Sequence, residues 1–146
     1  MDSHVRVAVL VIICCCGLFS ACSNSGDGAG AYPKAVNKAD ETSAIQSLRT
    51  IATAETQAKA MRNSYVDLAT LVQLGFLDER FAGPNPNIRG YRFAVTATEN
   101  EYSVVADPQP TATAPATGGR HFYLDSTDNV IRVNATQGAT RQDPSL

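Results

Sequence analysis

The fold depends first on residues 43–52, which read Ser-Ala-Ile-Gln-Ser-Leu-Arg-Thr-Ile-Ala. They lie in a segment from Asn37 to Arg62 that contains neither glycine nor proline and is rich in residues that favour helices. At about 100° per residue, the apolar side chains of this segment gather on one broad face. That face is formed by Ala44, Ile45, Leu48, Ile51, Ala52 and Ala58. The pattern predicts a long helix whose apolar face packs on a sheet.

One charged residue, Glu55, falls inside this apolar face. A functional interpretation makes it a contact between subunits. The structural interpretation pairs it with Lys59, one turn further along the helix, or places its carboxylate at the edge of the face. The sequence favours the structural interpretation, because oppositely charged pairs at this spacing are common on helices.

A second, shorter helical pattern lies between Tyr65 and Phe81. Its apolar positions are Leu68, Leu71, Val72 and Leu74. Gly75 ends it, and Gly-Pro-Asn-Pro-Asn at residues 83–87 predicts a loop. The pattern predicts a short packed helix rather than a functional site.

The spacing of the large apolar residues changes to two after this loop, as in a β-strand. Residues 91–96 alternate in this way, and residues 102–106 alternate again beyond a turn at Glu99-Asn100. The two runs therefore predict a β-hairpin.

Two further strands are predicted near the C-terminus. A proline-containing connection at residues 107–119 leads to residues 121–125 and 130–133, which flank a turn at residues 126–129. Taken together, these patterns predict an α+β domain over residues 37–146. Its long N-terminal helix packs on an antiparallel sheet of about four strands, with a short second helix beside them.

The N-terminal residues have the pattern of an export signal. Arg6 is followed by an apolar stretch over residues 7–19, which is shorter than the roughly 20 residues that span a bilayer. We therefore predict a signal peptide over residues 1–21. Residues 22–36, rich in Ser, Gly, Asn and Ala, predict a flexible tether.

The end of this signal, Leu18-Phe19-Ser20-Ala21-Cys22, resembles the lipobox of bacterial lipoproteins. The resemblance implies that Cys22 is diacylated on sulfur, becomes the first residue on cleavage and is then acylated on its amine. Two or more acyl chains anchor a protein stably to a membrane. The alternative is ordinary cleavage after the triplet at residues 29–31, which would release a secreted protein.

The residue after the cysteine bears on the location. Ser23 is not the aspartate associated with inner-membrane retention in some enteric lipoproteins. In a bacterium with two membranes, the resemblance therefore favours an outer-membrane lipoprotein that faces the periplasm or the cell exterior.

Several segments of the mature chain occur in a recognisable order. They are Asp40 to Ile51, Gly90 to Phe93, Tyr102 to Pro108, Arg120 to Asp125 and Val130 to Arg132. In this order they resemble the globular region of type IV pilins and of the major-type pseudopilins of type II secretion. Pilins begin with a processed Phe-Thr-Leu-Ile-Glu segment that packs the filament core, and nothing in this sequence resembles it. We therefore expect a pilin-like domain that does not polymerise as a pilin does.

Candidate metal ligands occur around the second hairpin. His121 and Asp125 lie four residues apart on one strand face and would form a metal site with Asp128, although zinc usually requires three or four ligands. The pseudopilin resemblance suggests calcium instead, held by Asp125, Asp128 and Asn129. A hairpin turn explains these Asp and Asn residues without an ion, and we favour that interpretation.

The remaining signals restrict the function. The sequence contains no Gly-x-Ser-x-Gly elbow, phosphate-binding loop or His-Glu-x-x-His helix, so we expect no catalysis and no cofactor beyond the lipid on Cys22. A net charge of -2 gives no basic surface for nucleic acid.

Two function classes remain. The first is a structural or protein-interaction module, with a partner in a secretion or pilus machine and an exposed apolar or charged patch. The second is a binding protein for a small ligand or an exported polymer. It would require a concave pocket lined by aromatic residues such as Tyr91, Tyr102 or Tyr123.

Overall fold

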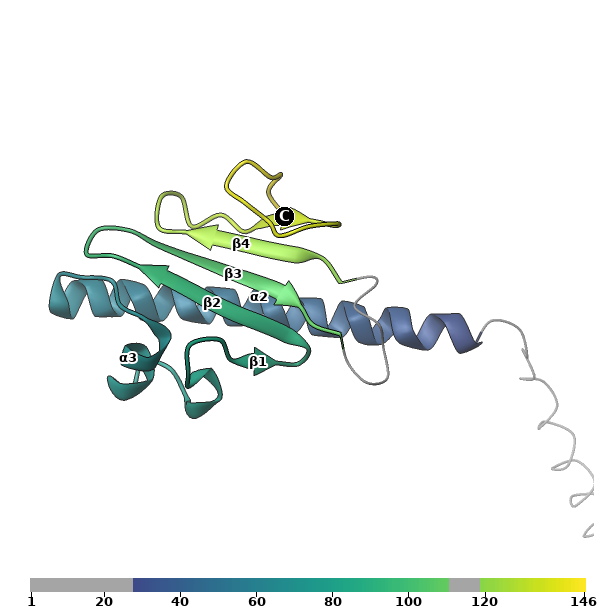
Figure 1. Cartoon of the computed structure of the whole chain (residues 1–146), viewed down its shortest axis with the longest axis horizontal. Helices are drawn as coiled ribbons and strands as arrows, with labels where there is room; N and C mark the ends of the chain where they lie inside the picture. The colour runs from purple at the N-terminus through teal and green to yellow at the C-terminus, as the bar shows by residue number, and fades with distance from the viewer. Residues whose placement is uncertain (1–27, 111–118) are drawn as a thin grey trace, which may run out of the picture.

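The computed structural model describes residues 28–110 and 119–146. The predicted signal peptide and Cys22 lie outside these residues. Within them, the long helix α2 (Gly28–Arg62) runs along one face of a five-stranded antiparallel sheet, accompanied by the short helix α3 (Leu68–Gln73) (Figure 1). The predicted α+β class, with a long and a short helix, is confirmed.

The sheet has the strand order β1-β2-β3-β4-β5, so each strand pairs with its neighbours in sequence. Its strands are β1 (Asn87–Ile88), β2 (Tyr91–Ala97), β3 (Tyr102–Pro108), β4 (His121–Asp125) and β5 (Arg132–Asn134). Both predicted hairpins are present, as β2 with β3 and β4 with β5. A short 3-10 helix, η1 (Glu79–Phe81), precedes the sheet.

The prediction of about four strands omitted β1. This strand pairs with the start of β2 through Asn87↔Arg92 and Ile88↔Tyr91, around a two-residue turn at Arg89-Gly90. Both turn residues have positive φ, 47° and 75°, as the tight turns of β-hairpins require. The two prolines just before β1 concealed it, because proline normally indicates a loop.

Helix α2 begins at Gly28 rather than at Asn37, so residues 28–36 of the predicted tether are helical. Alanine at positions 29, 31 and 35 favours the helix, whereas the glycines and Pro33 suggested flexible chain. Figure 1 shows the first turns of α2 projecting beyond the end of the sheet.

The core lies between α2 and the inner face of the sheet. Leu48 and Ile51 of the predicted helix face are fully buried, as are Phe93 and Phe122 on the sheet. Ile45 is only partly buried at the border of this face. The remaining buried apolar residues are Ala44, Ala54, Ala58, Leu68, Leu71, Leu77, Phe81, Tyr91, Tyr102, Val104, Ala106, Leu124, Ile131 and Ala139. The predicted packing of the helix on the sheet is therefore confirmed.

An ion pair fastens α2 to the start of β4. The Glu41 carboxylate accepts hydrogen bonds from the Arg120 backbone N–H at 3.1 Å and from its guanidinium Nε and Nη2 at 3.1 and 2.9 Å. Glu41 is almost fully buried. The contact joins residues 79 positions apart in the sequence and holds the start of β4 against α2.

Candidate functional site

The sheet face turned away from α2 carries a groove of about 490 Å³. Its floor includes Thr96, Ser103, Val105 and Tyr123, from β2, β3 and β4. These residues alternate with the buried ones, so their side chains stand on the outer face. The C-terminal segment 139–142 forms a wall. We call this hollow the outer-face groove.

The buried carboxylate of Asp125 holds this wall in place. Its Oδ2 accepts hydrogen bonds from Arg141 Nε at 2.7 Å and from Tyr123 Oη at 3.0 Å, and its Oδ1 accepts from Thr127 N at 2.9 Å. Arg141 also donates to the Thr127 hydroxyl. Asp125 is 4% exposed, so its negative charge is compensated by donors of the chain itself.

These contacts also set the charge of Asp125. Burial alone would raise the pKa of its carboxyl, but the hydrogen bonds from Arg141 and Thr127 outweigh burial and lower the pKa to about 2. Asp125 is therefore an anion at neutral pH and holds the Arg141 cation beside the groove.

Asp143 ties the same segment to β5. Its carboxylate accepts hydrogen bonds from Thr140 N at 2.7 Å and from Asn134 Nδ2 at 2.8 Å. The backbone N–H of Leu146 donates to Ile131 O at 2.9 Å, so the end of the chain also lies along the sheet. The groove wall is thus attached at several points.

Replacing Asp125 with alanine should loosen this wall, because the Arg141 guanidinium and the Tyr123 hydroxyl lose their shared acceptor. We expect amide hydrogen exchange at residues 139–146 to accelerate by about tenfold or more, while α2 exchanges as before. The folded pKa lies below the ordinary value of 3.8, so the stability from this carboxylate is present above about pH 4. It should be lost as the pH falls through about 2.

Asp78→Ala serves as the matched control, since Asp78 pairs with Arg80 at an exposed position outside the groove lining. It should leave exchange at residues 139–146 nearly unchanged. If amide exchange at residues 139–146 accelerated equally in both variants, Asp125 would not be the residue that holds the wall.

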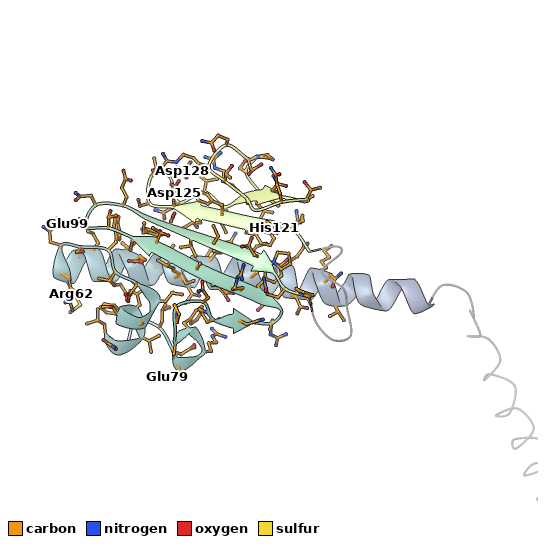
Figure 2. The ribbon with its side chains drawn as sticks, viewed as in Figure 1. Arg62, Glu79, Glu99, His121, Asp125 and Asp128 are labelled. Carbon is orange, nitrogen blue, oxygen red and sulfur yellow. The ribbon has the colours of Figure 1, made fainter. Side chains whose placement is uncertain are left out.

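The candidate metal set of His121, Asp125 and Asp128 is not brought together, because His121 lies apart from the two aspartates. Figure 2 shows Asp125 and Asp128 near one end of β4 and His121 at the other end. His121 Nδ1 lies 2.7 Å from Asp107 Oδ1 on β3. Four strand residues span about 13 Å, so His121 cannot share an ion with Asp125. Among the described residues, no group of three or more His, Cys, Asp or Glu side chains is placed to hold a metal.

The three candidate calcium ligands each accept hydrogen bonds from the chain. Asp128 Oδ1 accepts from Val130 N at 3.0 Å, and its Oδ2 pairs with Arg132. Asn129 Oδ1 accepts from Tyr102 Oη at 2.6 Å, and its φ of 53° suits an Asn in a turn. This geometry favours the turn interpretation.

Of the three candidate pocket tyrosines, Tyr102 and Tyr123 line the groove and Tyr91 does not. The Tyr91 hydroxyl donates to Arg120 O at 3.0 Å, and the residue is buried in the core. Tyr102 is also buried, so Tyr123 is the half-exposed aromatic residue of the groove. Sequence reasoning missed Arg141, because no pattern around it links it to Asp125.

Glu55 has a different environment from the predicted one. It is fully buried, and its Oε2 accepts a hydrogen bond from Val66 N at 3.1 Å. Its Oε1 has no partner among the described residues. Lys59 instead donates to the carbonyls of Asn63 and Glu99, at 3.0 and 2.8 Å. The predicted Glu55–Lys59 pair is therefore wrong.

Burial raises the pKa of Glu55 to about 7; the hydrogen bond from Val66 opposes the shift, and the nearby Asp67 carboxylate adds to it. Glu55 contacts Val66, in the connection between α2 and α3, and is not among the residues that line the groove. Its chemistry therefore concerns stability rather than the groove.

No helix within residues 28–110 and 119–146 is both long and apolar enough to cross a membrane. No model of a known protein family matches the chain, and no curated protein matches it.

Proposed function

We propose that this chain is a lipid-anchored, non-catalytic envelope protein whose pilin-like domain binds a small ligand or an exported polymer in the outer-face groove. The observation that carries the proposal is the groove itself. It is a hollow of about 490 Å³ with a wall held in a defined position by Asp125 and Asp143. Ligand sites in proteins commonly measure about 300–1,000 Å³.

The charges of the groove suit binding better than catalysis. A carboxylate with a pKa of about 2, such as that of Asp125, is a weak base at neutral pH. Its oxygens already accept three hydrogen bonds from the chain. Asp125 therefore positions Arg141 and Tyr123 instead of moving protons.

Between the two function classes, the groove favours a small ligand or an exported polymer. A concave surface that includes an aromatic side chain is the feature that distinguishes this class from a flat protein-contact patch. Tyr123 supplies that aromatic surface.

A protein partner in a secretion or pilus machine is the second candidate. It is favoured by the first turns of α2, which project beyond the sheet and leave that end of the helix without cover from the sheet (Figure 1). In this proposal the lipid on Cys22 takes the place of the apolar half-helix of a pilin. The protein keeps its membrane attachment without the polymerising segment.

Replacing Cys22 with alanine should abolish labelling by radioactive palmitate and release the protein from membranes, because acyl chains supply the anchor. The measurement is labelling in a bacterial host, followed by separation of the membrane and soluble fractions. Sucrose-gradient separation of the wild-type membranes then tests the outer-membrane location.

Cys14→Ala is the matched control, because Cys14 lies inside the predicted signal peptide. It should leave labelling unchanged. Continued labelling and membrane attachment of the Cys22→Ala protein would contradict the anchor. Co-purification of secretion or pilus components from detergent-solubilised envelopes would support the second candidate.

A further inference from the structure

We infer that the outer-face groove binds a neutral saccharide, such as a short run of an exported glycan, with the ring of Tyr123 as its packing surface. The inference rests on the proposed function of the groove as a binding surface and names the chemical class of the ligand.

Hydroxyl groups dominate the polar lining of the groove. They belong to Thr96, Thr98, Ser103, Ser126 and Thr140, together with Tyr123. A serine or threonine hydroxyl can both donate and accept a hydrogen bond. The hydroxyls of a sugar have the same dual capacity. The lining therefore matches a polyol better than a ligand that offers only acceptors or only donors.

Several of these hydroxyls are already oriented by the chain. Ser126 Oγ accepts from Tyr102 N at 3.2 Å, and Thr140 Oγ1 donates to Asp143 at 2.9 Å. Thr96 and Ser103 lie opposite each other across β2 and β3, on the floor of the groove. Because their positions are fixed before a ligand arrives, less conformational entropy is lost on binding.

Tyr123 provides a rigid apolar surface within this polar lining. Its hydroxyl donates to Asp125 Oδ2 at 3.0 Å, which restricts the orientation of the ring. Val105 is its direct neighbour across β3 and β4 and also lines the groove. A sugar ring presents C–H groups on one face and hydroxyls around its edge, so it can cover Tyr123 and Val105 while it bonds to the surrounding hydroxyls.

The charges of the groove favour a neutral ligand. Its charged residues are Glu101, Asp125 and Arg141. The Arg141 guanidinium already donates to Asp125 and to Thr127. An anionic ligand would therefore meet a cation whose charge is largely compensated.

The sheet also disfavours an extended peptide. The floor belongs to β2, β3 and β4, and β3 is paired on both sides. A peptide cannot add to β3 in the middle of the floor, because the backbone groups of β3 are committed to β2 and β4. Recognition must then depend on side chains, as it does for a saccharide.

The experiment is isothermal titration calorimetry of the protein as purified from its bacterial host, in a detergent without a sugar head group. The probes are maltotriose, cellotriose and triacetylchitotriose. We expect at least one to bind with a Kd of about 1 mM or tighter. Tyr123→Ala should weaken that binding about tenfold or more, whereas Tyr123→Phe keeps the ring and should stay within about threefold. Thr56→Ala, on an exposed turn of α2, should bind as the wild type does.

A second variant covers the case in which Tyr123→Ala does not fold. Ser103→Leu fills the floor from a strand position and should likewise weaken binding about tenfold. Absence of heat from all three probes up to about 10 mM would overturn the saccharide inference. Binding that survives both groove variants in folded protein would also overturn it.

The proposed function can survive that failure. If a protein or a charged polymer co-purifies with the wild type and is lost with Ser103→Leu, the groove is a binding surface but not for neutral saccharide. If groove variants change neither sugar binding nor co-purification, the proposed function of the groove fails as well.

Discussion

Replacing Ile45, Leu48 and Ile51 together with serine should abolish the cooperative unfolding transition of the domain. Leu48 and Ile51 are fully buried against the sheet, and Ile45 packs at the border of the same face. Removing a large buried aliphatic side chain costs about 2–5 kcal/mol, and burying an unpaired hydroxyl adds to that cost. Small domains have only about 5–15 kcal/mol of stability in total.

The measurement is a thermal melt followed by circular dichroism, compared with a control on the same helix. Met61→Ser removes an equally apolar side chain that is 73% exposed and should change the midpoint little. A melt of the triple variant that overlays the wild type would rule out the packing of α2 on the sheet.

The second large effect is a loss of stability as the pH rises through neutrality. Glu55 has a pKa of about 7 in the folded chain, against an ordinary value of 4.5. A folded pKa above the unfolded one means that the folded state binds more protons between these values, so the free energy of unfolding falls as the pH rises. A difference of this size corresponds to about 3 kcal/mol, lost between about pH 4.5 and pH 8.

The physical cause is the environment of the Glu55 carboxylate. Oε2 has the Val66 N–H as its donor, and Oε1 has no partner among the described residues. The groups that face it are acidic or phenolic: Asp67 at the start of α3, and Tyr102, whose pKa the Glu55 charge helps to raise. An ionised Glu55 is therefore buried without a compensating cation.

Urea unfolding at a series of pH values measures this dependence. Glu55→Gln keeps an oxygen for Val66 N–H but carries no charge, so the fall between pH 4.5 and pH 8 should disappear. The exposed Glu79→Gln should retain the wild-type profile. Should Glu55→Gln lose stability over this range as steeply as the wild type, the buried carboxylate is not its source.

At low pH the free energy of unfolding changes in the opposite direction and falls as the pH falls. Hydrogen bonds hold the pKa values of Asp67, Asp125 and Asp143 below their ordinary range. The stability that these carboxylates add is lost below about pH 4. The domain should therefore be most stable in mildly acidic solution, near pH 4–5, between the two losses.

The helix face and the main hairpins could be predicted because their signals are local. The spacing of Leu48 and Ile51 follows the helical repeat, and the alternation in residues 91–96 follows the strand repeat. Both patterns arise from backbone geometry, which does not depend on the rest of the fold. The start of α2 and the two-residue strand β1 were missed, because glycine and proline in those segments indicated irregular chain.

The candidate site depended on contacts between distant residues. Tyr123 was a candidate from its place on a strand, but the groove also needs a wall, which Arg141 attaches to Asp125, 16 residues earlier. Lys59 also depends on a distant contact. Its ammonium group donates to the carbonyl of Glu99, 40 residues away, and does not pair with Glu55. The rule that opposite charges four residues apart on a helix form pairs takes no account of such distant partners.

Apolar side chains recur with the period of the helix or strand that carries them, so the residues that face the core could be predicted from this pattern alone. The contacts of the polar residues depend instead on how the chain packs. A carboxylate takes its partner from whichever donors the packed chain brings within hydrogen-bond distance, and the balance between burial and these hydrogen bonds then sets its charge. Hence Asp125 is a fixed anion beside the groove, whereas Glu55 is a buried acid that ionises only near neutral pH.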